Sequence, residues 1–172
     1  MTALKVVLCL ALLHLLSLSA LCADQTVTIA TTNWNRVDFT NAWFSTRLLF
    51  SIPPGMTKVP VERREDILQG QCVSTNLLLQ FHYNWLDPLP GHPNYGPPEI
   101  VFLDGHLSKM WVLPNNVLYL LVRDVIGKNS LRMIIRYKSP ADVPIAKAIV
   151  ESIRFEEAQA STSLTPRRWP RL

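Results

Sequence analysis

The sequence has little glycine and little cysteine. Its six glycines form neither a Gly-rich loop that could cradle a phosphate nor the Gly-x-Ser-x-Gly elbow of a serine hydrolase. Of its three cysteines, Cys9 and Cys22 fall within the first 23 residues, which leaves Cys72 alone in the rest of the chain. A lone cysteine closes no intramolecular disulfide, so a small disulfide-stapled scaffold is excluded and Cys72 is expected to be a small buried hydrophobe.

The central part of the chain lacks a charge imbalance. The formal net charge of +4 depends on Lys5 near the start and on Arg167, Arg168 and Arg171 near the end. Without these four, basic and acidic residues are equal in number. The net charge therefore gives no reason to expect nucleic acid as a partner.

Histidines are few and scattered. No two of His82, His92 and His106 stand at a metal-motif spacing such as i,i+4 on a helix. The paired carboxylates at 65–66 and 156–157 lie in polar runs, where solvation is expected rather than catalysis. We expect no cofactor, no metal site and no catalytic residues. The alternative is an exported metal-dependent or hydrolytic enzyme that gathers these histidines with nearby aspartates.

The first 23 residues have the composition of a secretory signal peptide. Lys5 is followed by an apolar run, 6–16, that only His14 interrupts, and small residues then precede a polar start at Asp24. A membrane-spanning helix needs about 20 predominantly apolar residues, and this run is shorter. The predicted location is therefore secreted or periplasmic, with a membrane-anchored protein as the alternative.

A second alternative at the same place is lipidation of Cys22. Residues 19–22 resemble a bacterial lipoprotein box, but Leu21 stands where that box has a small residue. Membrane contact is expected only through an uncleaved signal or such a lipid.

The sequence divides into a signal peptide (1–23), a single α+β domain (24–157) and a disordered basic tail (158–172). The length of the middle region suits one domain with one core. The tail has Ser, Thr, proline and arginine with almost no apolar pattern, which is typical of disorder.

Alternation of apolar and polar residues dominates the domain. Segments 44–52, 76–85 and 131–138 alternate with period two, which predicts strands with one wet face each. Segment 27–31 is a weaker candidate for an edge strand. The run 117–122 is apolar on both faces, so a central, doubly covered strand is expected there.

Two connections predict hairpins. Asp104-Gly105 separates segments 99–103 and 106–113, and this dipeptide tolerates the positive φ values of a two-residue turn. A second turn, at 126–129, separates 117–125 from 130–138. Consecutive hairpins imply an antiparallel meander, and the predicted sheet has five to seven strands.

One helix is predicted near the end of the domain. Ser139, Pro140 and Asp142 form an N-terminal capping pattern, with Asp142 itself as an alternative cap. Apolar residues then recur at helical spacing, and Lys147 and Glu151 form an outward i,i+4 pair. We expect this C-terminal helix to pack on one face of the sheet, which makes the fold class α+β.

Two stretches carry a resemblance to a known family. They are the strand and turn of 47–56, Arg-Leu-Leu-Phe-Ser-Ile-Pro-Pro-Gly-Met, and the closing helix of 148–155, Ala-Ile-Val-Glu-Ser-Ile-Arg-Phe. With the meander between them, they resemble uncharacterised exported bacterial proteins of the PsbP/Mog1-like α+β superfamily. That resemblance implies a binding or assembly module and transfers no catalytic residues.

The candidate binding site is a proline-rich segment, 87–98, in which five of twelve residues are proline. Prolines reduce the entropy lost on ordering, so the segment can present Trp85, His92 and Tyr95 to a partner. The alternative is a linker that wraps the sheet with its aromatic side chains packed inward.

A stripe of basic residues on the last predicted strand is a second candidate. Arg132, Arg136 and Lys138, joined by Arg47 and Arg123, could bind an anion, while the alternative is a solvated strand face. The resulting prediction is an exported non-enzymatic binding or assembly module whose partner is another extracytoplasmic protein.

Overall fold

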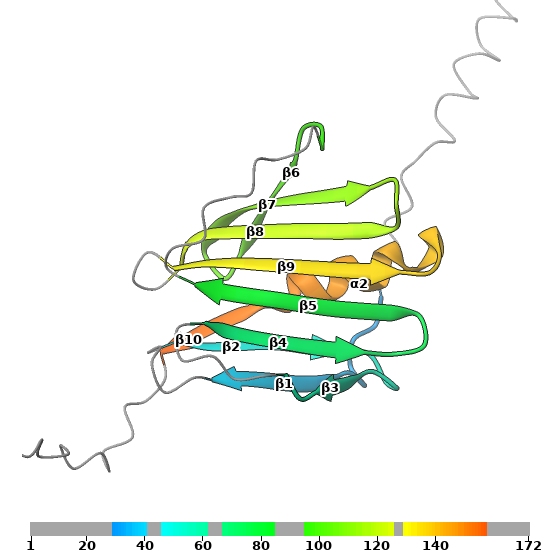
Figure 1. The fold of residues 1–172 in the computed structure, drawn as a ribbon, viewed down its shortest axis with the longest axis horizontal. Helices are drawn as coiled ribbons and strands as arrows, with labels where there is room; N and C mark the ends of the chain where they lie inside the picture. The colour runs from blue at the N-terminus through cyan, green and yellow to red at the C-terminus, as the bar shows by residue number, and fades with distance from the viewer. Residues whose placement is uncertain (1–28, 41–45, 62–66, 85–94, 126–128, 158–172) are drawn as a thin grey trace, which may run out of the picture.

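The computed structural model describes residues 29–40, 46–61, 67–84, 95–125 and 129–157 (Figure 1). Within these ranges the chain forms ten strands, a 3-10 turn and one nine-residue helix. The predictions for the signal peptide, Cys22, Trp85, His92 and the basic tail concern residues outside the described ranges. No helix within these ranges has the length and apolar character needed to span a bilayer.

The larger sheet is antiparallel, with strand order β3-β4-β5-β9-β8-β7-β6 (Figure 1). Its strands are β3 (Thr57–Val59), β4 (Leu68–Val73), β5 (Leu77–Asn84), β6 (Glu99–Leu103), β7 (His106–Leu113), β8 (Val117–Val125) and β9 (Asn129–Tyr137). Strands β6 to β9 form the predicted meander, and β9 then pairs with β5. Strand β8 lies inside the sheet and is covered on both faces, as its apolar sequence predicts.

A second sheet, which the sequence analysis did not predict, has the order β1-β2-β10. It contains β1 (Asn35–Thr40), β2 (Thr46–Ile52) and β10 (Arg154–Glu157). The prediction of a single sheet is therefore wrong. The helix packed on antiparallel sheet is confirmed, but the described chain is mostly strand, so α+β fits it only loosely. Residues 29–31 form no strand, in contrast to the expected edge strand there.

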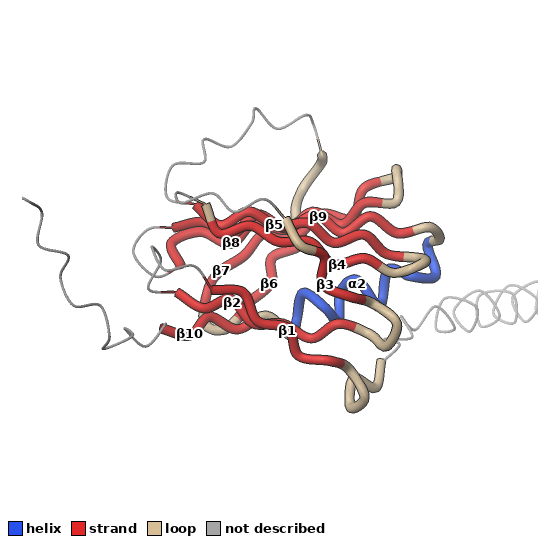
Figure 2. Tube along the Cα trace, turned by 60° about the horizontal axis from the view of Figure 1, so that its bottom comes forward, coloured by secondary structure: helices blue, strands red, loops and turns tan. Residues whose placement is uncertain are grey.

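The three-stranded sheet and the helix α2 (Val143–Glu151) lie on the same side of the seven-stranded sheet (Figure 2). We call this covered side the inner face and the opposite side the outer face. The core between the layers draws on both sheets and the helix; its fully buried members include Leu48, Phe50, Leu79, Phe81, Tyr83, Leu118, Leu120, Met133, Ile135, Ala146 and Ile149. One continuous core confirms that these residues point inward as their alternation predicts.

The helix begins where its capping residues predict and ends earlier. The Ser139 hydroxyl accepts a hydrogen bond from the Ala141 N–H, and the Asp142 carboxylate accepts one from the Ser139 N–H, across a 3-10 turn at Pro140–Asp142. The helix ends at Glu151, and 154–157 form β10 rather than the predicted last helical turn.

The two-residue turn between β6 and β7 is confirmed. Asp104 has φ of 50° and Gly105 has φ of 85°. Positive φ values at both turn residues are typical of two-residue hairpins, because they match the right-handed twist of the flanking strands. Leu103 pairs with His106 at its base, so β6 and β7 leave the turn in register. This turn fixes which residues of β6 face outward.

Candidate functional site

An aromatic cluster lies on the outer face of the larger sheet. Trp111 of β7 and Tyr119 of β8 are cross-strand neighbours with ring centroids 5.7 Å apart. Tyr95 contacts both rings, at 6.5 Å from Trp111 and 6.1 Å from Tyr119. The Trp111 indole N–H donates a 3.1 Å hydrogen bond to the Gly96 carbonyl, so the chain before β6 is attached to this face.

This geometry favours the alternative interpretation of Tyr95. The side chain is half-buried, with its ring against those of Trp111 and Tyr119. Trp85 and His92, the other two candidates of the proline-rich segment, lie outside the described residues. The structure therefore brings together Tyr95 and two aromatic residues that the sequence analysis had not singled out.

Next to the cluster lies an exposed apolar patch. We define the apolar patch as Ile100 and Phe102 of β6 with Leu107 of β7, whose side chains share the outer face. Phe102 is directly opposite Leu107 in the ladder. The exposed fractions are 50% for Ile100, 75% for Phe102 and 57% for Leu107. The largest contiguous apolar patch on a protein surface is often a functional one.

The apolar patch arises because β6 is apolar on both faces. Val101 and Leu103 point to the inner face, where Leu103 is buried in the core. A strand of an antiparallel sheet that is open on one face usually carries polar residues at the alternate positions. Ile100 and Phe102 occupy those positions instead, and this departure from alternation is the signal in the sequence that could have located the site.

The charged residues of the outer face have one sign. Lys109, Arg132 and Arg136 point outward on β7 and β9 and place positive charge beside the apolar patch and the cluster. The outward positions of the described strands β4 to β9, outside the irregular stretch between Val122 and Val125, include no aspartate or glutamate. The outer face is therefore both apolar and basic.

The predicted basic stripe is present only in part. Arg136 lies on the outer face, where its guanidinium donates a 2.9 Å hydrogen bond to the Gln80 side chain. Arg47 belongs to β2 in the other sheet, so it cannot join this face. The proposed union of Arg47 with the stripe is wrong because β2 lies in the second sheet.

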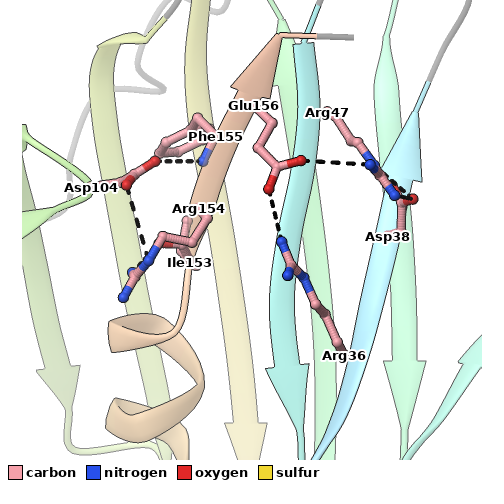
Figure 3. Close-up of polar contacts among 8 residues, drawn as sticks. All are labelled: Arg36, Asp38, Arg47, Asp104, Ile153, Arg154, Phe155 and Glu156. Carbon is pink, nitrogen blue, oxygen red and sulfur yellow. Dashed lines mark hydrogen bonds and ion pairs between the residues drawn. The ribbon is translucent and has the colours of Figure 1, made fainter. Parts of the chain in front are cut away.

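Acidic residues are found instead on the smaller sheet, as Figure 3 shows. Glu156 accepts from Arg36 at 2.8 Å and lies 3.5 Å from the Arg47 guanidinium, which also bonds Asp38. The hydrogen bond to Asp38 raises the pKa of Arg47. These ion pairs are exposed at the surface, where such pairs contribute little stability.

Among the described residues, Cys72, His82 and His106 do not come together in one cluster. Cys72 is fully buried in β4, and burial raises the pKa of its thiol to about 11, so the thiol is neutral at physiological pH. His82 lies exposed on the outer face of β5, whereas the His106 ring packs edge-on against Phe155 at 5.3 Å. In the described part of the chain no three His, Cys, Asp or Glu side chains gather as a metal site would require.

A polar contact joins the helix α2 to the strand β6, which carries part of the apolar patch. Lys147 forms a 2.7 Å ion pair with Glu99 of β6, in place of the predicted pair within the helix with Glu151. This contact holds the start of β6 from the inner face. The ion pair lies at the surface, so it contributes little stability, and the outward side chains of β6 stay exposed.

Searches against protein-family models, curated proteins and solved structures give no match. The resemblance to the PsbP/Mog1-like superfamily stays a prediction that rests on the two stretches quoted above.

Proposed function

We propose that this chain is an exported binding or assembly module that engages an extracytoplasmic protein through the outer face of its larger sheet. The observation that carries the proposal is the exposure of Ile100, Phe102 and Leu107 as one contiguous apolar patch. Export is supported by the signal-like sequence of the first 23 residues.

Burial of the apolar patch against a partner would contribute favourable free energy to binding. Its three side chains expose roughly 300 Å² together, from side-chain areas typical of such residues. At about 25 cal/mol per Å², complete burial corresponds to roughly 7 kcal/mol before the entropic cost of association. The apolar patch can therefore act as the centre of an interface, but a stable complex needs further contacts around it.

The surroundings of the apolar patch indicate the chemistry of the partner. Trp111 and Tyr119 are buried beside the apolar patch, where they support the outer face from below but add little exposed surface. Lys109, Arg132 and Arg136 supply positive charge on the same face. A partner surface that presents apolar side chains flanked by carboxylates matches both features.

The test compares two matched variants in a pull-down from an extracytoplasmic fraction. Phe102→Ser combined with Leu107→Ser removes most of the apolar patch. Val112→Ser is the control, because Val112 is 46% exposed but points to the opposite side of β7. We expect partners of the wild-type protein to be lost with the double variant and retained with the control. Identical partner sets for all three proteins would refute the proposal.

A further inference from the structure

Strand β6 has one open edge, and its backbone N–H and C=O groups there form no hydrogen bond within the described part of the chain. Strand β6 is the last strand of its sheet and pairs only with β7. In a two-residue hairpin the pair at the base of the turn is hydrogen-bonded, and hydrogen-bonded pairs then alternate. Leu103, Val101 and Glu99 therefore bond β7, whereas the N–H and C=O groups of Ile100 and Phe102 point to the open edge.

The other three sheet edges are protected against pairing. Strand β3 has only three residues and includes Lys58. Strand β1 carries Arg36 and Asp38, and β10 carries Arg154 and Glu156. Short strands and charged side chains are the features by which native proteins block edge-to-edge association.

Strand β6 lacks these protective features along its central residues. Its sequence Glu-Ile-Val-Phe-Leu has one charge, at Glu99, and that carboxylate is paired with Lys147. Prolines 97 and 98 precede the strand and limit pairing to the five residues of β6 itself. An apolar, uncharged edge of this kind is a template for another strand.

We propose that β6 pairs with β6 of a second copy of this chain, antiparallel and centred on Val101. The inference goes beyond the proposed function, because the second copy occupies the open edge of β6 and leaves the outer face accessible to a partner. In this register Ile100 stands opposite Phe102 of the second copy, and Phe102 stands opposite its Ile100. Ile100 and Phe102 are the residues whose N–H and C=O groups point to the open edge of the sheet. In this register each of these groups forms a hydrogen bond with the second copy.

The side chains are compatible with the same register. On the outer face, Ile100 and Phe102 of one copy lie beside Phe102 and Ile100 of the other, so the two apolar patches become continuous. On β7 of each copy, Leu107 lies next to Phe102 and Lys109 lies next to Ile100. Glu99 stands opposite Leu103, so no like charges face each other. The two Lys109 residues are three strand spacings apart, about 14 Å, which exceeds the Debye length of about 8 Å at physiological ionic strength.

The area sets the strength of this association. Side chains on one face of a continuous sheet pack sideways, so each apolar patch loses only its flank to the second copy and its outward surface stays in solvent. The total area buried is therefore well below the roughly 600 Å² that full covering of both apolar patches would bury. Stable dimers generally bury at least about 1,200 Å² in total. We therefore expect a weak, concentration-dependent dimer, with a dissociation constant of roughly tens to hundreds of micromolar.

The first measurement is sedimentation equilibrium of the full chain over a concentration range that brackets this constant. Ile100→Pro is the edge variant, because it removes an N–H that points away from β7 and so spares the hairpin. We expect the mass of the wild type to rise towards that of a dimer and the mass of the edge variant to remain that of one chain. Ile100→Val, which keeps the donor, is the control and is expected to behave as the wild type.

The second measurement tests the register. Val101→Cys, in a background with Cys9 and Cys22 replaced by serine, places two cysteines opposite each other at a non-hydrogen-bonded pair, where the spacing suits a disulfide. We expect mild oxidation to give a covalent dimer. Val59→Cys on the β3 edge is the matched control and is expected to give none.

Each result decides between this inference and the proposed function. A single-chain mass at all concentrations overturns the pairing, as does a dimer that Ile100→Pro leaves intact or an equal yield of disulfide from Val59→Cys. If the wild type is monomeric but the Phe102→Ser/Leu107→Ser variant still loses its partners, pairing fails and the proposed function stands. If the sedimentation mass is unchanged by Ile100→Pro and the pull-down partners are unchanged by Phe102→Ser/Leu107→Ser, both the β6 pairing and the proposed function are refuted.

Discussion

The Asp104 carboxylate accepts a 2.7 Å hydrogen bond from the Phe155 backbone N–H. This bond joins the turn of the β6–β7 hairpin to the edge of β10, and so connects the two sheets (Figure 3). Asp104 also lies 4.0 Å from the Arg154 guanidinium, and His106 packs against the Phe155 ring. The hairpin that carries the apolar patch is thereby fixed at its turn.

Loss of this contact is expected to destabilise the fold. Asp104→Ala removes a charged acceptor and places alanine at a positive φ, so we expect a loss of about 2 kcal/mol in the free energy of unfolding. Asp104→Asn keeps an acceptor and tolerates positive φ, so a loss of about 1 kcal/mol or less is expected. Urea unfolding measures both. Equal stability of the alanine variant and the wild type would show that the contact contributes nothing.

Gly70 is required by packing between the two sheets. A Cβ at this position of β4 would overlap the rings of Phe39 and Phe81, which pack edge to face with centroids 4.7 Å apart. We expect Gly70→Ala to cost about 1–3 kcal/mol, the usual range for overpacking a core. Phe39→Leu in the same chain removes part of the overlap and should recover some of that loss. A Gly70→Ala variant as stable as wild type in urea would contradict this packing.

Burial of Cys72 predicts a loss of stability at alkaline pH. The thiol has a pKa of about 11 in the fold, against 9.0 for the ordinary group, because burial disfavours the thiolate. Between these values the unfolded chain releases the proton and the folded chain keeps it, so the stability that is present below pH 9 declines as pH rises towards 11. The decline from this group is expected to reach roughly 2 kcal/mol.

The variant Cys72→Ala separates this effect from other titrations. Burial also raises the pKa of Tyr83 and Tyr137, so the variant keeps part of the alkaline decline. We expect its unfolding free energy, measured in urea at several pH values, to fall less steeply above pH 9 than that of the wild type. Parallel curves would exclude the thiol as a source of the decline.

The sequence predicts those elements in which local pattern and burial agree. Strands β5 and β9 each place four alternating residues in one core, and the Asp104-Gly105 turn is dictated by positive φ values that few other dipeptides accept. The Ser139 cap was equally visible, because its hydrogen bonds are local. These features depend on neighbouring residues alone.

The second sheet and the exposed apolar patch depend on contacts between distant residues. Strand β1 has a single buried residue, Phe39, and β10 pairs with β2 more than a hundred residues earlier in the chain. Nothing in their own alternation reveals that pairing. The lack of polar residues at the alternate positions of β6 is visible in the sequence. Whether those apolar side chains are buried or exposed becomes clear only when the neighbouring layers are placed.

Phe81 and Phe102 offer a test of whether the apolar patch can be changed without loss of the fold. Phe81 is 1% exposed in the core, whereas Phe102 is 75% exposed on the outer face. We expect Phe81→Ala to lose about 3–5 kcal/mol of unfolding free energy, as for a buried aromatic residue, and Phe102→Ala to change it by at most about 0.5 kcal/mol. Phe102→Ala should also lower the fluorescence of the apolar, anionic dye 8-anilinonaphthalene-1-sulfonate bound to the native protein, while Val112→Ala should not. If Phe102→Ala destabilised the fold as Phe81→Ala does, Phe102 would be part of the core and could not be the centre of an interface.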